Sequence, residues 1–295
     1  MKTFSIYAPM SKEYFDIWTK RFPAYTPAYK DHPREDYHLV SGKYPIFVIA
    51  DGVTLKRDEH GNYPVPSGAG ELAKLFCEKV IEEAEKIYDS FSEESLKLVF
   101  QAGNKVTKEL NDKHDLVEGK LNYRDVDYFS ATTSFALLKD GKMYWWSMHD
   151  CGVKAVNSVG MLVFNSPKVI PNKEKFFVGK QDTMTETELL KAIRRNYRNK
   201  IDTEGNLSGY GVVTGEEIAP MYLSTGMFDL KDVATVLVYT DGFENYVEDE
   251  KFLKLVAEWS ENFAVDISDF SASKSAEDPK MFGQERSLIV IKIDK

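Results

Sequence analysis

The chain has 295 residues, 43% of them hydrophobic, which is enough for one large core or two small ones. Its net charge is −9, and Lys and Arg are scattered apart from a short cluster at 194–198, so composition argues against nucleic-acid binding. Only two Cys residues, no apolar run approaching about 18 residues and no apolar leader predict a cytoplasmic protein without a membrane span.

The first third of the chain predicts two strands followed by two helices. Residues 37–40 read as a strand that Glu35 and Asp36 precede, and the apolar run 46–50 predicts a buried strand. Apolar residues at three- and four-residue spacing predict a helix over 67–88. A second helix is expected at about 92–111, with Ser92 as its N-cap.

The middle of the chain changes to short strands. They are expected at 134–138, 143–147, 153–156 and 161–164, and the turn signal at 139–142 joins the first two as an antiparallel hairpin. A third helix is expected at about 185–199, because residues 185–188 have a capping-box pattern.

The C-terminal part contains another apolar run, at 236–240, then a helix at about 249–260 and a final strand at 287–293. Helices therefore occur in pairs between blocks of antiparallel strands, without regular β-α-β alternation. This order predicts a layered α+β fold in a single domain, 1–295. Segment 157–235 is the least regular part, and we expect it to form a flap or lid.

Both apolar runs end in the same dipeptide, Asp51-Gly52 and Asp241-Gly242. Asp-Gly is a common turn sequence, so either copy alone is consistent with a simple turn. However, Glu35, Asp36 and Glu285 also lie beside strands. Carboxylates grouped in a protein interior repel one another unless cations neutralise them, and oxygen ligands favour Mg²⁺ or Mn²⁺. Two such ions about 3.5–4 Å apart hold a bridging hydroxide, which can hydrolyse a phosphate ester.

The ordered set of acidic motifs resembles the metal-dependent Ser/Thr protein phosphatases of the type 2C class, over about residues 30–293. The segments that carry the resemblance are Pro33-Arg34-Glu35-Asp36, Ala50-Asp51-Gly52-Val53, Ser67-Gly68-Ala69-Gly70-Glu71, Ala131-Thr132-Thr133, His149-Asp150-Cys151-Gly152, Thr240-Asp241-Gly242-Phe243 and Gln284-Glu285-Arg286-Ser287. The resemblance implies a four-layer αββα sandwich with two antiparallel sheets between helix pairs.

The resemblance also implies roles for the acidic residues. Asp51 would bridge two Mg²⁺ or Mn²⁺ ions, and the Gly52 carbonyl would bind the first ion. Asp36 would orient metal-bound water. Asp150 matches a position that helps to hold a weaker third ion. The second ion would be held by Glu35, Asp241 and Glu285, of which Glu285 takes the place of a usual Asp.

Some features of that family are missing from the sequence. The family has a phosphate-binding Arg four residues before the Glu, and that position is Asp31 here. Arg34, Lys56 and Arg57 are alternative candidates, although side chains alternate along an extended strand, so Arg34 should face away if Glu35 faces the metal.

Two further positions differ. Val53-Thr54-Leu55 replaces a His that often follows the Asp-Gly segment, and Asn245 replaces an Asp of the third metal site. His149, beside Asp150, is either a structural residue or a catalytic one.

We therefore expect a phosphatase for phosphoserine and phosphothreonine in proteins that uses a metal-bridging hydroxide. Two alternatives remain at this stage, an inactive pseudophosphatase that binds a partner and a phosphatase for small molecules.

Overall fold

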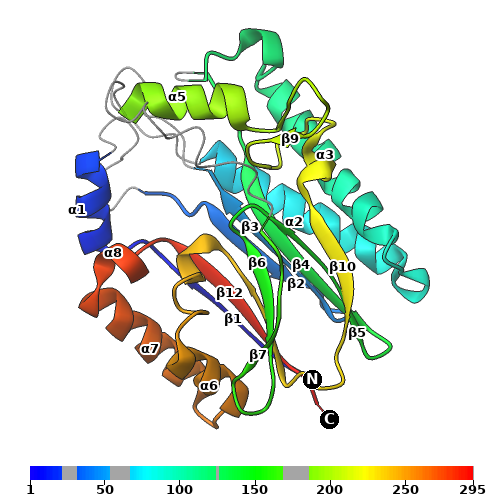
Figure 1. Ribbon diagram of the computed structural model, residues 1–295, viewed down its shortest axis with the longest axis vertical. Helices are drawn as coiled ribbons and strands as arrows, with labels where there is room; N and C mark the ends of the chain where they lie inside the picture. Colours follow the sequence, from blue (N-terminus) through cyan, green and yellow to red (C-terminus); the bar gives the residue numbers. More distant parts are fainter. Residues whose placement is uncertain (22–31, 54–66, 124–125, 169–185, 295) are drawn as a thin grey trace.

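The computed structural model describes residues 1–21, 32–53, 67–123, 126–168 and 186–294. Two five-stranded antiparallel sheets lie face to face, and helices cover the outer face of each sheet (Figure 1). This arrangement is the αββα sandwich that the resemblance to the type 2C phosphatases implies, and it confirms the layered α+β fold expected from the element order. The N-terminus and the C-terminal segment lie side by side at one end of the sandwich, where the Met1 amino group pairs with Asp294.

The first sheet has the strand order β10-β5-β4-β3-β2. Its strands, in chain order, are β2 (Asp36–Val40), β3 (Ile46–Gly52), β4 (Ala131–Lys139), β5 (Lys142–Met148) and β10 (Ser224–Asp229). Strand β3 contains the first apolar run and pairs with both β2 and β4, so it lies inside the sheet.

The second sheet has the strand order β1-β12-β11-β6-β7. Its strands are β1 (Lys2–Ala8), β6 (Gly152–Val156), β7 (Leu162–Asn165), β11 (Thr235–Tyr239) and β12 (Arg286–Lys292). Strand β11 contains the second apolar run and pairs with β12 and β6, so it is also an internal strand. Both runs are therefore internal strands, β11 at the centre of its sheet and β3 next to the edge strand β2.

Two helix pairs form the outer layers. Helices α2 (Gly68–Lys86) and α3 (Ser95–Lys113) cover the first sheet, and α6 (Glu250–Glu258) and α7 (Phe263–Glu277) cover the second (Figure 1). The Ser67 hydroxyl accepts a hydrogen bond from the Gly70 amide at the start of α2, and Asp249 caps α6 in the same way. Such caps bond amides that have no partner inside the helix.

Alternation along the internal strands divides the apolar residues among three cores. In β3, Ile46, Val48 and Ala50 pack toward α2 and α3, whereas Phe47 and Ile49 pack toward the second sheet. A third core lies between the second sheet and helices α6 and α7. Because both faces of these strands are buried, their sequences read as continuous apolar runs.

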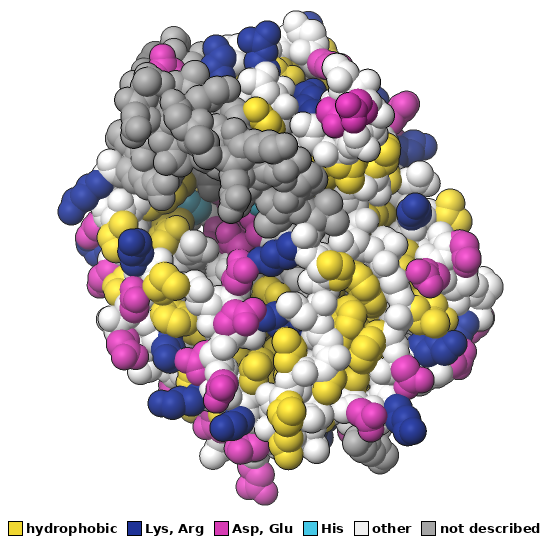
Figure 2. Space-filling view, viewed as in Figure 1, with side chains coloured by type: hydrophobic (Ala, Val, Ile, Leu, Met, Phe, Trp, Pro, Cys, Tyr) yellow, Lys and Arg dark blue, Asp and Glu magenta, His cyan; other side chains and the backbone are white. Residues whose placement is uncertain are grey.

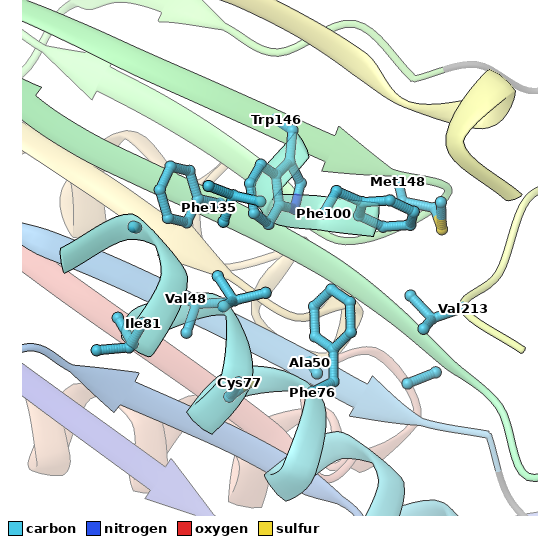
Figure 3. Packing of buried hydrophobic residues seen from close by; sticks show 14 of the residues in the cluster. Val48, Ala50, Phe76, Cys77, Ile81, Phe100, Phe135, Trp146, Met148 and Val213 are labelled. Carbon is cyan, nitrogen blue, oxygen red and sulfur yellow. The ribbon is translucent and has the colours of Figure 1, made fainter. Parts of the chain in front are cut away.

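Aromatic side chains fill much of the core under α2 and α3 (Figure 3). Phe135 of β4 and Trp146 of β5 stack with ring centroids 4.0 Å apart, and Phe100 of α3 meets Trp146 edge-on. Phe76 of α2 contacts Phe100 in turn. These contacts join both helices to β4 and β5 of the first sheet.

The remaining elements lie around the ends of the sandwich. They are α1 (Lys12–Arg21), α5 (Glu186–Tyr197), α8 (Pro279–Phe282), the small hairpin β8 (Lys200–Ile201) and β9 (Leu207–Ser208), and four 3-10 turns (Tyr88–Ser90, Glu118–Lys120, Ala219–Tyr222, Asp241–Phe243). In the part of the chain that the structure describes, no helix is both long enough and apolar enough to cross a membrane.

The segment predicted as a flap, 157–235, contributes one edge strand to each sheet, β7 and β10. Between them, α5 is tied to the 118–130 loop by a buried ion pair. Asp127 accepts hydrogen bonds from Arg198 at 2.6 and 3.1 Å and from Arg194 at 3.1 Å. A flap therefore stays a proposal for the part between these two strands, of which 169–185 lie outside the described residues.

Several local predictions differ from the structure. The second helix begins at Ser95, so Ser92 is not its N-cap; the Ser92 amide instead donates to the Ser95 hydroxyl. The capping box cannot be assessed because Thr185 lies outside the described residues. Elements β1, α1 and α7 were not predicted from the sequence.

Candidate metal centre

The two Asp-Gly strand ends meet in one cleft between the sheets. This cleft has a volume of about 220 Å³, and its lining includes Asp36, Asp51, Asp150, Asp241 and Glu285. Figure 2 shows acidic side chains gathered in the middle of this face, next to the grey atoms. The simple-turn interpretation does not explain why acids from both sheets converge on one cleft.

Strand alternation places Asp51 in this cleft. Phe47 and Ile49 face the second sheet, and Asp51 follows them at the same two-residue spacing. In the register of the first sheet, Asp51 lies opposite Asp36 of β2 and opposite Thr132 of β4. The side chains of β3 that face the second sheet are thus apolar as far as Ile49 and become acidic at Asp51. The site therefore lies at the end of the apolar core between the sheets.

The two glycines have a role other than turn formation. A Cβ atom on Gly52 would lie 2.8 Å from the Glu35 carbonyl oxygen, and one on Gly242 would lie 2.1 Å from the Glu285 carbonyl oxygen. Neither glycine has a positive φ. Each Asp-Gly strand end thus packs directly against the backbone of another acidic residue, which only glycine permits without displacement of that backbone.

Crowding of the carboxyl groups changes their pKa values. Burial, followed by the charge of Glu285, raises the pKa of Asp36 well above its ordinary value, and burial with the charge of Asp36 does the same for Asp51. Burial and the charge of Asp150 raise the pKa of Asp241 to about 7. Raised pKa values of this kind are expected for a buried group of acids that has no cation to neutralise it.

Asp150 differs from the other acids because a His lies beside it. Burial acts to raise its pKa, but the charge and hydrogen bond of His149 and a hydrogen bond from Thr132 outweigh burial and lower the pKa to about 2. The His149 Nδ1 atom lies 2.8 Å from Asp150 Oδ2, and the His149 backbone has a φ of 56°. His149 is not among the residues that line the cleft, so its contacts support a structural role.

Hydrogen bonds across the sheets hold the acids in place. The Thr240 hydroxyl donates to Asp36 Oδ2 at 2.8 Å and accepts from the Ser287 amide at 2.9 Å. Glu285 Oε1 accepts from the Glu35 and Asp36 amides, at 2.9 and 3.1 Å. Residues of β2, β11 and β12 are joined in this way at one end of the sandwich.

Glu35 lies behind the cleft rather than in its lining. It is 1% exposed, and its Oε1 accepts a hydrogen bond from the Ser67 hydroxyl at the start of α2. Glu35 is nonetheless close to Glu285, since the amide of Glu35 donates to that side chain. All the acids singled out in the sequence therefore lie at one end of the sandwich.

A comparison with protein family models decides the family. The model for protein phosphatase 2C matches residues 26–273, which is most of the chain. The chain belongs to the protein phosphatase 2C family. This confirms the family and the enzyme class, protein phosphatase, that the sequence predicts. The matched region includes Glu35, Asp51, Asp150 and Asp241 but ends before Glu285.

Solved structures of bacterial protein phosphatases share the fold. The serine/threonine phosphatase PstP/Ppp of Mycobacterium tuberculosis is 13% identical, with 100% of this chain and 99% of that chain covered and a TM-score of 0.54. Stp1 of Staphylococcus aureus is 13% identical, with 100% and 96% covered and a TM-score of 0.56.

A third solved structure is the catalytic domain of PstP in complex with two manganese ions. It is 14% identical, with 98% and 96% covered and a TM-score of 0.51. At these identities the likeness shows the fold alone. No curated protein sequence matches the chain.

In this protein phosphatase 2C chain, none of the candidate cations among the described residues takes the place of the family's phosphate-binding Arg. Arg34 faces away from the cleft, as alternation predicts: its Nε donates to the Asp36 carbonyl, and its guanidinium lies 4.2 Å from the centroid of the Tyr7 ring. Lys56 and Arg57 lie outside the described residues. Among the described residues that line the cleft, none is Lys or Arg.

Sequence reasoning missed one wall of the cleft. Met10 and, on α1, Tyr14 and Trp18 line it together with the acids. The only sequence signal was the four-residue spacing of the two aromatic residues, which places them on one side of a helix. Because the sequence does not predict α1, this spacing alone does not indicate that Tyr14 and Trp18 lie at the site.

Proposed function

We propose that this chain is a metal-dependent phosphatase for phosphoserine and phosphothreonine in proteins. The observation that carries the proposal is the convergence of Asp36, Asp51, Asp150, Asp241 and Glu285, from both sheets, on one cleft. The family match supports it, and so does the likeness to PstP, whose catalytic domain was solved with two manganese ions.

The residues of the site are suited to divalent cations. The acids in the cleft offer only oxygen ligands, which match Mg²⁺ and Mn²⁺. Without cations, three of these carboxyl groups have raised pKa values, so ionising them in the folded protein is costly. When bound, two cations supply a hydroxide nucleophile at neutral pH and neutralise the phosphate.

Each acid has a proposed task. Asp51 would hold both cations, and the adjacent Gly52 carbonyl would bind the first. Asp36, held by the Thr240 hydroxyl, would orient a water molecule. Asp150 would contribute to a further, weaker cation site. The second cation would be held by residues beside strands of both sheets: Glu35, Asp241 and Glu285.

A third cation has less support than the first two. Asn245 stands where the family has an Asp, and its side-chain amide donates to the Met281 carbonyl at 2.6 Å. An amide that is engaged in this way contributes no negative charge to the site.

The aromatic side chains that line the cleft, Tyr14 and Trp18, favour a protein substrate over a small phosphoester. Tyr14 and Trp18 offer apolar surface beside the acids, where residues that flank a phosphorylated side chain can pack. A small phosphoester has no such flanking residues.

A pseudophosphatase is the second candidate function. One observation favours it: the described lining of the cleft contains no cationic side chain to bind a phosphate. Such a protein would keep the cations and the fold but would bind a phosphorylated partner without turnover.

The test is hydrolysis of p-nitrophenyl phosphate and of a phosphothreonine peptide with added Mn²⁺. We expect activity that EDTA abolishes and that Asp51→Asn and Asp241→Asn each lower by about 100-fold or more. Asp269→Asn, at an exposed position of α7, is the matched control and should retain full activity.

Calorimetry with Mn²⁺ separates the two candidate functions. Binding of two ions without turnover would favour the pseudophosphatase. Activity that survives EDTA, or that persists in both site variants, would exclude a metal-dependent phosphatase.

A further inference from the structure

His32 lies with two of the acids in a cluster suited to a metal ion. His32, Glu35 and Glu285 each offer one ligand atom, and these three atoms lie within 4.8 Å of one another. Ligand atoms around one octahedral cation are at most about 4 Å apart, since each bond is ~2.1 Å. A side-chain shift of under about 1 Å would therefore place all three atoms on one ion.

Outer hydrogen bonds orient both carboxylates of the cluster. The Ser67 hydroxyl donates to Glu35 Oε1. Glu285 Oε1 accepts from the Glu35 and Asp36 amides, and its carboxylate also bonds the Tyr7 hydroxyl. Contacts of this kind fix the orientation of metal ligands and add to metal affinity.

One ring nitrogen of His32 contacts a backbone carbonyl. Its Nδ1 lies 2.8 Å from the Pro33 carbonyl oxygen. A carbonyl oxygen can only accept, so Nδ1 carries the proton of the neutral ring and Nε2 carries the lone pair. A bond from Nδ1–H to a backbone carbonyl is the usual second contact of a metal-binding His.

We propose that His32 Nε2 is a ligand of the second cation, together with Glu35 and Glu285. The inference rests on the proposed function, which places a divalent cation on these two acids. His32 is not part of the acidic motifs that carry the resemblance to the family, and nothing in those motifs points to a nitrogen ligand.

A nitrogen ligand changes which metal the protein selects. Imidazole suits Fe²⁺ and Zn²⁺ best, and Mn²⁺, as a first-row transition metal, accepts it more readily than Mg²⁺, which prefers oxygen and water. The site of the second cation would therefore favour Mn²⁺ over Mg²⁺. The site around Asp51, which offers only oxygen, would accept either ion.

Pulsed electron paramagnetic resonance of the full chain loaded with Mn²⁺ tests the nitrogen ligand directly. We expect a ¹⁴N modulation in the natural chain and its loss in His32→Gln. His149→Gln is the matched control, because His149 contacts Asp150, another acid of the cleft. That variant should keep the modulation.

Calorimetry gives a second readout. His32→Gln should lower the Mn²⁺ affinity of one of the two sites by tenfold or more and leave the affinity of the other unchanged. It should also reduce the ratio of Mn²⁺ affinity to Mg²⁺ affinity at the affected site. Circular dichroism checks the fold of the variant. If the variant does not fold, the natural chain grown with ¹⁵N-histidine still gives a result, because the isotope changes a modulation that arises from a His ligand.

The outcomes separate this inference from the proposed function. Two bound Mn²⁺ ions with turnover but without ¹⁴N modulation would overturn the His32 ligand and leave the phosphatase intact. Modulation that is lost in His149→Gln instead of His32→Gln would also overturn it. A ¹⁴N modulation that requires His32 but is not accompanied by turnover would support the ligand and exclude the active enzyme.

Discussion

Asp36 and Asp51 are direct partners in the register between β2 and β3, so two carboxyl groups lie opposite each other on neighbouring strands. Like charges opposite each other destabilise an antiparallel pair. Burial is the largest cause of the raised pKa of both groups; the charge of Asp36 adds to it at Asp51, and the charge of Glu285 adds to it at Asp36. The pairing is unfavourable in the protein alone, and a divalent cation bound between the two carboxyl groups would offset their repulsion.

The two cleft glycines should not tolerate a side chain. Gly242→Ala places a Cβ atom 2.1 Å from the Glu285 carbonyl oxygen, and Gly52→Ala places one 2.8 Å from that of Glu35. We expect each to lower the free energy of unfolding by about 1–3 kcal/mol, with the larger effect at Gly242, and to weaken Mn²⁺ binding. Thermal denaturation and calorimetry measure the two effects.

The control for these variants is Gly42→Ala, since a Cβ atom there meets nothing within 4 Å. It should change neither stability nor Mn²⁺ binding appreciably. Equal behaviour of all three variants would mean that the close approach to the acidic backbone does not matter.

Arg34 should affect stability and not phosphate binding. Its guanidinium stacks on Tyr7 and its Nε bonds the Asp36 carbonyl, away from the cleft. We expect Arg34→Gln to lower the free energy of unfolding by about 1–2 kcal/mol and to change KM for p-nitrophenyl phosphate by less than about twofold. A KM that rises tenfold or more would instead identify Arg34 as a phosphate ligand.

Trp18 should contribute to the binding of peptides. It lines the cleft together with Tyr14 and the acids. We expect Trp18→Ala to raise KM for a phosphothreonine peptide by about 3- to 10-fold, which corresponds to an aromatic contact of about 1 kcal/mol, with a smaller change in kcat. A peptide shortened to phosphothreonine itself is the comparison substrate. If both substrates lose affinity equally, Trp18 does not contact flanking residues.

The buried ion pair under α5 should be important for stability. Asp127 and Arg198 are both nearly buried, so removing one charge leaves the other without compensation. We expect Asp127→Asn to cost about 3–5 kcal/mol in urea denaturation. Asp112→Asn removes an exposed partner of Lys108 and should cost less than about 1 kcal/mol. A cost at Asp127 no larger than at Asp112 would contradict this account.

Stability should fall in mild acid because of His38. Burial, followed by the charge of Arg34, lowers the pKa of His38 to about 4. The unfolded chain has an ordinary His pKa near 6.5, so between pH ~6.5 and ~4 the unfolded state binds a proton that the native state does not. The free energy of unfolding therefore decreases as the pH falls through this window, by an amount on the order of 2 kcal/mol.

His38→Gln cannot bind that proton, so its free energy of unfolding should change less over the same window. Urea denaturation of both proteins at pH 7 and pH 4.5 measures the difference. Parallel pH profiles would show that His38 has the same pKa in both states.

The sequence predicts best where residues repeat at a strong period. The helix expected at 67–88 is α2, and both apolar runs are internal strands, because each buries a continuous apolar face. Helix α7 was missed because its buried face includes Ser271 and Ser275, which give no apolar period. Packing against the second sheet, rather than amphipathic pattern, holds this helix in place.

The acids of the site were predictable because each follows or precedes an apolar strand. Their mutual placement was not, since it depends on how the two sheets dock. The position of His32 and the contacts of Glu285 with the Glu35 and Asp36 amides arise only in three dimensions. For the same reason the sequence could not show that Gly52 and Gly242 pack against acidic backbone.

The division of the acids between two sheets has a consequence for folding. Asp36 and Asp51 belong to one sheet, while Asp241 and Glu285 follow or precede strands of the other, and the bond from the Glu35 amide to Glu285 joins residues 250 positions apart. Contacts of such long range form late, because they require most of the chain to be ordered first. The moment at which the refolding chain binds Mn²⁺ would therefore report when the two sheets dock. An intermediate with only the first sheet formed would bind the metal weakly.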